Sequence, residues 1–218
     1  MPKVLAVLQP KGGASKTTLA VNLAAAMLRA GYDVVLVDSD PQGTARDIVS
    51  ARTDDQQPIR IYGIDRPELL AREVSHIRNE YVIIDGASKA NKLTDAAIRA
   101  ADMVLIPVQP SHLDIWATED LVNMIMDRRA NIEDLGRTLK AAFVWTRVIG
   151  TSDIDQDILD DLGVFNLPVI EGTLGQRKAY SRAAGKGRSV FDYKPKNKDA
   201  IAEVELIMAN VMEIMEGA

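Results

Sequence analysis

The alternation of short apolar runs with longer amphipathic segments constrains this chain most. The strongest runs cover residues 3–8, 34–38, 81–85, 103–108 and 141–146, and weaker ones cover 59–62 and 167–170. Runs that are apolar at nearly every position are typical of strands buried on both faces, as in a parallel sheet. The pattern therefore predicts an α/β fold, with a mostly parallel, twisted sheet and helices on both of its faces.

Amphipathic periodicity predicts the helices between these strands. It favours helices over residues 16–30, 67–79, 93–101, 113–129, 153–162 and 201–215. No internal repeat, low-complexity tract or linker interrupts the alternation, so residues 1–218 are expected to form one domain. In folds of this kind ligands bind beyond the carboxyl ends of the strands, so functional side chains are expected there.

Composition excludes several kinds of site. The 218 residues include no cysteine and two histidines. Disulfides, zinc–cysteine sites, thiol nucleophiles and cysteine-ligated iron–sulfur clusters are therefore ruled out, and a histidine metal site has little support. No apolar run approaches the roughly 20 residues that a membrane-spanning helix needs. We expect a cytoplasmic protein.

A glycine-rich segment lies between the first apolar run and the first predicted helix. Its residues are Lys11, Gly12, Gly13, Ala14, Ser15, Lys16, Thr17 and Thr18. Glycines let backbone N–H groups approach phosphate oxygens, and the N-terminus of a helix adds partial positive charge. The segment is typical of a phosphate-binding loop, although Pro10 and Ser15 occupy the glycine positions of the GxxxxGK[ST] pattern. A glycine-rich turn that only caps the helix is the alternative.

Several motifs in the same order resemble those of the ParA/MinD family of deviant Walker A ATPases, especially small plasmid-type (ParF-like) ParA proteins. Residues 11–18 resemble the family's KGGxGKTT box, and VDSDPQ at 37–42 resembles its second box. YVIID at 81–85 resembles the Walker B strand, and segments 106–117 and 176–190 are similar to plasmid-type members. The resemblance covers roughly residues 3–195 and implies a single P-loop NTPase domain that binds ATP with Mg²⁺.

The glycine-rich segment supplies three candidate side chains. Lys16 can reach the β- and γ-phosphates, and the Thr17 hydroxyl can ligate Mg²⁺. By resemblance, Lys11 is the family's signature lysine, which reaches across a dimer interface to the partner's nucleotide. There it would neutralise the charge on the transferred phosphoryl group. A solvated loop lysine is the alternative for Lys11.

Three acidic residues end predicted strands. Asp38 and Asp40 are two residues apart, so their side chains are expected to share a face. By resemblance, Asp38 lies near the magnesium waters, Asp40 positions the attacking water, and Asp85 holds a magnesium-bound water. Alternatively, Asp40 opens an ordinary turn. Asp85 alternatively ends its strand as an ordinary acid, because residues 86–87 replace the family's usual Thr-Pro-Pro.

Ser15 is the main departure from the family's box. The family's glycine at this position adopts φ > 0 without penalty, whereas serine is strained there and its Cβ lies close to the phosphate position. Ser15 therefore predicts weaker nucleotide affinity or slower turnover. By the same resemblance, Thr146, Arg147 and Pro168 are expected to line the adenine pocket.

Residues 176–198 form a basic segment. It holds eight Lys or Arg residues and one acid, in a chain whose formal net charge is −5. Such a patch can bind DNA phosphates without reading sequence, as ParA proteins do when ATP dimerises them. Arg182, Lys186 and Arg188 are the first candidates for DNA contact, and a merely solvated basic surface is the alternative. The last predicted helix is rich in glutamate, which an anionic membrane repels, so no membrane partner is expected.

The resemblance implies an ATPase switch in plasmid or chromosome partition. An ATP-bound homodimer would bind nonspecific DNA on the nucleoid, and hydrolysis stimulated by a ParB-like centromere-binding protein would release it. Three alternatives stay open: positioning of another cargo such as a carboxysome or relaxosome, a nucleotide-binding scaffold with negligible hydrolysis, and a metabolic P-loop kinase or synthetase. Lys11 and the basic segment argue against the metabolic enzyme, whereas Ser15 keeps the scaffold open.

Overall fold

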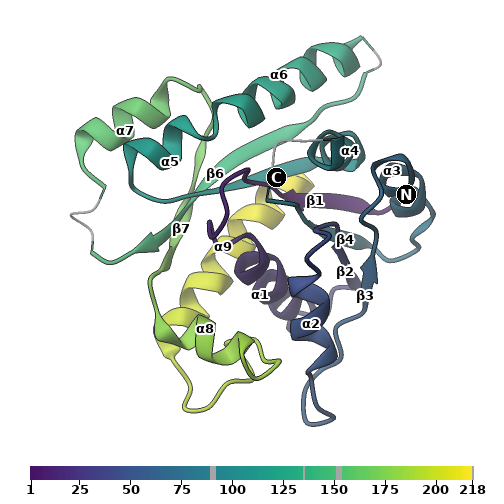
Figure 1. The fold of residues 1–218 in the computed structure, drawn as a ribbon, viewed down its shortest axis with the longest axis vertical. Coiled ribbons are helices and arrows are strands. Elements are labelled where there is room, and N and C mark those ends of the chain that lie inside the picture. Colours follow the sequence, from purple (N-terminus) through teal and green to yellow (C-terminus); the bar gives the residue numbers. More distant parts are fainter. Residues whose placement is uncertain (89–91, 135, 151–153, 218) are drawn as a thin grey trace.

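The computed structural model describes residues 1–88, 92–134, 136–150 and 154–217. In this part of the chain seven strands form one sheet in the order β3-β2-β4-β1-β5-β6-β7, and every pairing is parallel (Figure 1). The strands are β1 (Lys3–Val7), β2 (Val34–Asp38), β3 (Ile61–Gly63), β4 (Tyr81–Asp85), β5 (Met103–Val108), β6 (Lys140–Val148) and β7 (Val169–Gly175). The predicted α/β class is confirmed.

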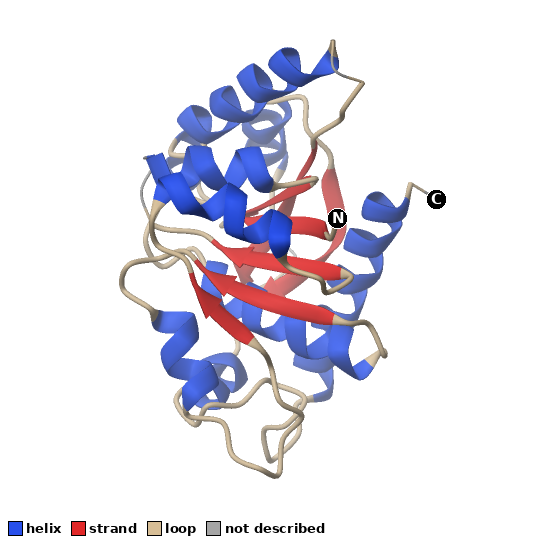
Figure 2. Cartoon of the chain, turned by 90° about the vertical axis from the view of Figure 1, so that its right-hand side faces the viewer, coloured by secondary structure: helices blue, strands red, loops and turns tan. Residues whose placement is uncertain are grey.

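Helices lie on both sides of the sheet, which Figure 2 shows from the side. They are α1 (Lys16–Arg29), α2 (Thr44–Ser50), α3 (Pro67–His76), α4 (Lys92–Ala100), α5 (His112–Trp116), α6 (Glu119–Glu133), α7 (Gln156–Gly163), α8 (Lys178–Ala184) and α9 (Lys198–Glu216). None of the helices among the described residues is long and apolar enough to cross a membrane.

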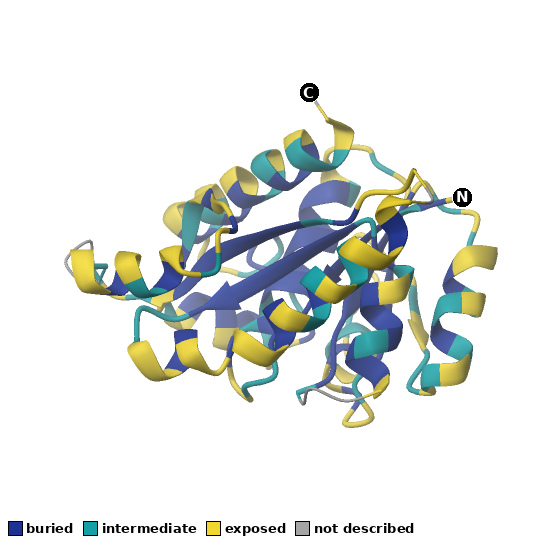
Figure 3. Cartoon of the chain, turned by 90° about the horizontal axis from the view of Figure 1, so that it is seen from above, coloured by how far each residue is buried: buried dark blue, intermediate teal, exposed yellow. Residues whose placement is uncertain are grey.

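The core consists of two layers, one on each face of the sheet. Residues of α1, α2, α8 and α9 pack on one face, and residues of α3 to α7 pack on the other. Successive strand side chains point to opposite faces, so Leu5 and Val7 belong to the first layer and Val4 and Ala6 to the second. Because both faces are covered, the inner strands β2, β4 and β5 are buried along their length, whereas the edge strands β3 and β7 are partly exposed (Figure 3).

The predicted helix over residues 113–129 is two helices, α5 and α6. They separate at Thr118, which is fully buried. Its hydroxyl donates to the carbonyl oxygen of Ile115 at 2.5 Å, and its backbone N–H donates to the same oxygen at 2.9 Å. A threonine that bonds the backbone three residues earlier competes with helix continuation, which explains the break.

Other element boundaries also differ from the prediction. Helices α2 and α8 were not predicted, because each has seven residues and too few apolar positions to show a period. Strand β7 runs to Gly175, five residues beyond the predicted end, through a polar stretch that hides it. Helix α7 begins at Gln156, while the predicted start at 153 lies outside the described residues.

The strand order places the glycine-rich segment at the centre of one sheet edge. Strand β1 lies between β4 and β5. After α1 the chain continues to β2, on the β4 side of β1, and after α4 it continues to β5, on the other side. The register aligns Val7 with Asp85, and Asp85 with Asp38, at the carboxyl ends of these strands. This is the position at which open parallel sheets bind ligands.

Candidate functional site

The loop between β1 and α1 takes the left-handed backbone conformation at two residues. Gly13 has φ +76° and Ser15 has φ +66°. Ser15 is the N-cap of α1, and its carbonyl oxygen accepts from Leu19 N at 2.8 Å, while its side chain makes no capping bond. The expected positive φ at Ser15 is confirmed, and for a residue with a Cβ it costs about 1–2 kcal/mol.

Lys16 lies buried on the inner side of this loop. Its Nζ donates to the Lys11 carbonyl oxygen at 3.3 Å and to Ser88 Oγ at 3.2 Å. Burial lowers the pKa of Lys16, and the nearby carboxylates of Asp85 and Asp40 oppose that shift. A buried ammonium at a glycine-rich loop that leads into a helix N-terminus is suited to a polyanionic ligand.

Asp85 and Thr17 form the acidic side of the site. Thr17 Oγ1 donates to Asp85 Oδ2 at 2.8 Å, and the buried Asp85 Oδ1 has no hydrogen-bond partner among the residues that the structure describes. Desolvation raises the pKa of Asp85 to about 7; the Thr17 hydrogen bond acts against this rise, and the charge of Asp38 adds to it. Hydroxyl and carboxylate oxygens are ligands that Mg²⁺ prefers, so this pair, with one free oxygen, fits a hydrated Mg²⁺.

Asp38 holds the turn that leads into α2. Its Oδ1 accepts from Asp40 N at 3.0 Å and its Oδ2 accepts from Arg46 N at 3.0 Å. Burial raises the pKa of Asp38, and the contacts with Arg46 and Asp40 counteract that shift. Each carboxylate oxygen therefore accepts one backbone N–H of the turn, and the metal-side role that the resemblance implies stays a prediction.

Asp40 divides its carboxylate between the turn and the phosphate loop. Oδ1 accepts from Gln42 N at 3.0 Å, so the residue does open a turn. Oδ2 accepts from Ser88 Oγ at 3.3 Å, and the same hydroxyl accepts from Lys16. Asp40, Ser88 and Lys16 are thus connected in one chain of hydrogen bonds.

Lys11 is paired with a residue of α5. Its Nζ lies 2.6 Å from Asp114 Oδ2, and the two side chains are 40% and 8% exposed. Lys11 is therefore more than a solvated loop lysine, because its charge faces a nearly buried carboxylate.

The three residues expected at the adenine are divided by the fold. Thr146 is buried, and its hydroxyl donates to the Val108 carbonyl oxygen at 3.3 Å. Arg147 (φ +57°) is exposed, and its Nη2 lies 3.5 Å from where a Cβ on Gly13 would be. Pro168 precedes β7, and its carbonyl oxygen accepts from Phe143 N. Pro168 is therefore at the amino end of its strand, which the register across β5 and β6 places level with the carboxyl end of β1.

The basic segment contains exposed and tethered cations. Arg182 and Lys186 are exposed, and Lys186 Nζ lies 5.6 Å from the centre of the Tyr193 ring. Arg188 is tethered, because its Nη2 lies 2.8 Å from Asp55 Oδ2 and its Nη1 donates to the Asp192 carbonyl oxygen. Of the three candidates for DNA contact, Arg188 is thus the one held by contacts within the chain. Further exposed cations of the segment are Lys178, Lys194, Lys196 and Lys198.

Three residues of the site were not predicted to belong to it. Asp114 lies in the segment 106–117, which is similar to plasmid-type ParA proteins, but the sequence assigned it no role. Arg46 belongs to α2, which was itself missed. Ser88 follows the departure at residues 86–87, and only the fold shows that this departure brings a hydroxyl to Lys16.

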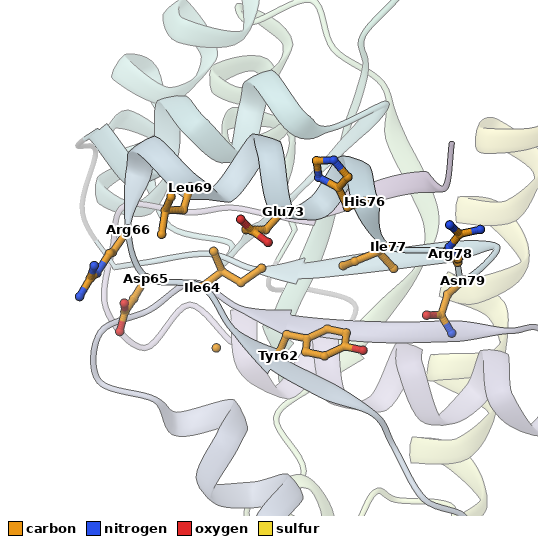
Figure 4. Close-up of a pocket in the computed structure, with 11 residues that line it drawn as sticks. Tyr62, Ile64, Asp65, Arg66, Leu69, Glu73, His76, Ile77, Arg78 and Asn79 are labelled. Atoms are coloured by element: carbon orange, nitrogen blue, oxygen red, sulfur yellow. The ribbon is translucent and has the colours of Figure 1, made fainter.

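A cavity of about 650 Å³ lies elsewhere, between the edge strand β3 and α3 (Figure 4). Tyr62 and Ile64 line it from the strand side, and Leu69, Glu73 and His76 line it from the helix. None of the residues around the phosphate loop lines it. The site is therefore identified by its converging charged groups, not by cavity size.

Comparison with known proteins agrees with this geometry. The sequence matches the family described as the CobQ/CobB/MinD/ParA nucleotide binding domain over residues 5–190. It is 33% identical over 204 residues to a maintenance of carboxysome distribution protein A from Gloeobacter kilaueensis, covering 90% of this chain and 87% of the relative. It is 29% identical over 212 residues to the protein of that name from Halothiobacillus neapolitanus, covering 95% of each. The chromosome-partitioning ATPase Soj of Thermus thermophilus is 26% identical over 242 residues, covering 96% of each.

Solved structures share the fold. Cobyrinic acid a,c-diamide synthase from Mycobacterium smegmatis, with bound ADP and magnesium, has a TM-score of 0.72 and 24% identity, covering 100% of this chain and 97% of the synthase. MinD from Pyrococcus horikoshii, complexed with Mg-ADP, has a TM-score of 0.71 and 17% identity, covering 99% of each. The chain therefore belongs to the ParA/MinD family of nucleotide-binding domains, and its phosphate-binding loop lies at the carboxyl end of β1 in a parallel seven-stranded sheet.

Proposed function

We propose that this chain is a Mg²⁺-dependent ATPase whose ATP-bound form dimerises, binds DNA without reading its sequence and positions a cargo. The observation that carries the proposal is the convergence of Lys16, Thr17 and Asp85 at a loop with a left-handed backbone at Gly13 and Ser15. The membership in the ParA/MinD family supports it, since a partitioning ATPase and two carboxysome distribution proteins are among the relatives.

The phosphates of ATP would lie against the backbone amides of residues 12–18. Lys16 would bind the β- and γ-phosphates, Thr17 would ligate Mg²⁺, and Asp85 would hold a metal-bound water through its free oxygen. Bound Mg²⁺ would neutralise charge on the phosphate oxygens. The exposed Arg147 lies beside Gly13 and would add a further positive charge at the loop.

Hydrolysis needs an oriented water more than a strong base. The water oxygen forms a bond to the γ-phosphorus while the bond from that phosphorus to ADP's bridging oxygen breaks, giving ADP, inorganic phosphate and a proton released to solvent. Asp40 Oδ2 is the candidate to orient that water, because it already reaches the Lys16 side of the loop through Ser88.

Dimerisation would bring Lys11 to the nucleotide of a second copy. In the single chain its ammonium is held by Asp114 on α5. The same helix exposes Leu113 and Trp116, which are 68% and 59% exposed. A paired lysine beside two exposed apolar side chains supports an interface at this edge of the sheet.

DNA binding would use the exposed cations of the basic segment. Its helix α8 follows the carboxyl end of β7, so the segment starts at the same sheet edge as the nucleotide site. Arg182 and Lys186 are candidates for contact with DNA phosphates, and such contacts do not depend on the base sequence. Arg188 would act indirectly, by holding the loop that contains Asp55.

Two kinds of cargo are compatible with the proposed function. Plasmid or chromosomal DNA would require a ParB-like centromere-binding partner, and hydrolysis stimulated by that partner would release the ATPase from the nucleoid. The carboxysome distribution relatives support a protein-shelled cargo with its own adaptor as a second candidate. Genes adjacent to the one encoding this chain would distinguish these cargoes.

A DNA-binding assay with ATP, ADP and no nucleotide tests the proposal. We expect nonspecific duplex DNA to bind only with Mg²⁺ and ATP, and Lys16→Ala to bind none under any of these conditions. Equal DNA binding with ATP and ADP would contradict a nucleotide switch. ADP formation then separates the remaining alternatives: a scaffold forms none, and a metabolic kinase or synthetase forms ADP only with a small-molecule substrate.

A further inference from the structure

Ser88 occupies a distinct position in the hydrogen-bond chain at the phosphate loop. Its hydroxyl accepts from Lys16 Nζ at 3.2 Å and donates to Asp40 Oδ2 at 3.3 Å. A hydroxyl has one donor and two acceptor positions, so this arrangement uses its single donor on Asp40. Ser88 therefore orients Asp40 Oδ2, whose remaining acceptor position could face a water.

The backbone before Ser88 is fixed against β1. Gly86 N donates to the Val7 carbonyl oxygen at 3.1 Å. A Cβ at Gly86 would lie 2.3 Å from Leu8 Cδ2 and 2.9 Å from the Val7 carbonyl oxygen, so only glycine fits. Ala87 is buried in turn. The two residues that replace the family's Thr-Pro-Pro pattern thus form a rigid connection that brings the next residue to Lys16.

The other Asp40 oxygen is already used. Oδ1 accepts from Gln42 N, which fixes one end of the carboxylate in the turn. The Ser88 hydroxyl fixes the other end. A carboxylate held at both oxygens keeps one orientation, which is what a water-positioning group needs before the reaction begins.

We propose that Ser88 is a positioning residue for ATP hydrolysis, acting through Asp40 to orient the attacking water. The proposal rests on the proposed ATPase function and assigns to this chain's own Gly86-Ala87-Ser88 segment the task of ordering that carboxylate. Removing the hydroxyl leaves Lys16 and the backbone amides in place, so hydrolysis of bound ATP is affected more than ATP affinity.

Single-turnover hydrolysis of radiolabelled Mg·ATP, together with equilibrium ATP binding, tests this assignment. For Ser88→Ala we expect hydrolysis of bound ATP to fall about tenfold, the size of a lost hydrogen bond to a charged group. The dissociation constant for ATP should change less than about twofold. Ser88→Thr retains the hydroxyl and should restore the rate to within about threefold. Ser75→Ala is the matched control, because the Ser75 hydroxyl donates to the Arg72 carbonyl oxygen within its own helix α3.

A double-mutant cycle makes the test independent of any fold defect in one variant. In an Asp40→Asn background the Ser88→Ala effect should shrink below about twofold, because both changes remove the same function. An undiminished tenfold effect in that background would overturn the proposal. So would an unchanged hydrolysis rate in Ser88→Ala, or a loss confined to ATP affinity. Failure of the ATPase proposal is recognised separately, as absence of phosphate release by the wild type.

Discussion

Lys11 and Asp114 form a 2.6 Å ion pair between the phosphate loop and α5. The Asp114 side chain is only 8% exposed, whereas Lys11 is 40% exposed, so the carboxylate is the fixed member and the lysine the movable one. In the proposed dimer Lys11 leaves this partner for the second copy's nucleotide. Dimerisation therefore competes with a contact inside the single chain.

Asp114→Asn should favour the dimer. The substitution removes the charge that holds Lys11, and a partly exposed pair of this kind contributes up to about 1 kcal/mol, or a few-fold in equilibrium. We expect the protein concentration for half-dimerisation with Mg·ATP to fall about threefold in analytical ultracentrifugation. Lys11→Ala is the companion variant and should not dimerise. Equal dimerisation of Asp114→Asn and wild type would show that the pair does not restrain Lys11.

Ser15→Gly should relieve backbone strain at the loop. Ser15 holds φ +66°, and its Cβ lies close to the expected phosphate position, so removing that Cβ is expected to tighten Mg·ATP binding by roughly fivefold, corresponding to about 1 kcal/mol. Isothermal titration calorimetry measures it. Asn166→Gly is the matched control, because Asn166 also has a positive φ, +51°, but lies in the turn after α7. Tighter binding in the control, or none in Ser15→Gly, would contradict strain at Ser15.

Asp85 predicts a pH-dependent stability. Its pKa is raised from 3.8 to about 7, so between these values the folded chain binds more protons than the unfolded chain. Its contribution to stability is therefore present at low pH, falls as the pH rises toward 7, and is constant above that. Asp85→Asn removes this loss. Between pH 5 and pH 8 urea unfolding should show Asp85→Asn gaining about 2–3 kcal/mol relative to wild type.

The same variant should lose its response to Mg²⁺, since an amide does not replace a carboxylate that holds a metal-bound water. Nucleotide affinity with and without Mg²⁺ measures this. In the urea experiment, a stability difference between Asp85→Asn and wild type that does not change with pH would show that Asp85 is not held in a desolvated site.

The sequence predicted the elements that are marked by a long apolar or amphipathic segment, and the site residues that lie within ordered motifs. The buried strands could be predicted from apolar runs, because side chains on both faces of the sheet pack against helices. Helices α2 and α8 were not predicted, because seven residues contain too few apolar positions to show a helical periodicity. The α5–α6 break depends on one buried hydroxyl, Thr118, whose partner is visible only in the fold.

The site residues that could be predicted are those that lie within one short motif or at the end of a predicted strand. The loop supplied Lys16 and Thr17, and strand ends supplied Asp85. Ser88 and Asp114 come from other elements, and only tertiary packing brings them to Lys16 and Lys11. The extent of β7 was also missed, because the strand continues past its predicted end to Gly175, and Pro168 directly precedes it.

The basic segment gives a prediction that separates exposed from tethered cations. Arg182→Ala combined with Lys186→Ala should weaken DNA binding and reduce the slope of log affinity against log salt by about 2. Arg188→Ala should lower the melting temperature, because it frees Asp55, and should change the slope little. Fluorescence anisotropy over a range of salt concentrations measures both. A larger slope change for Arg188→Ala than for the exposed pair would return Arg188 to the DNA surface.

The most direct measurement is a crystal structure with Mg²⁺ and a non-hydrolysable ATP analogue. It should show the triphosphate against the amides of residues 12–18, with Lys16 Nζ on the β- and γ-phosphates and Thr17 Oγ1 in the metal's coordination shell. A loop without the analogue, or an analogue bound elsewhere on the chain, would contradict the account.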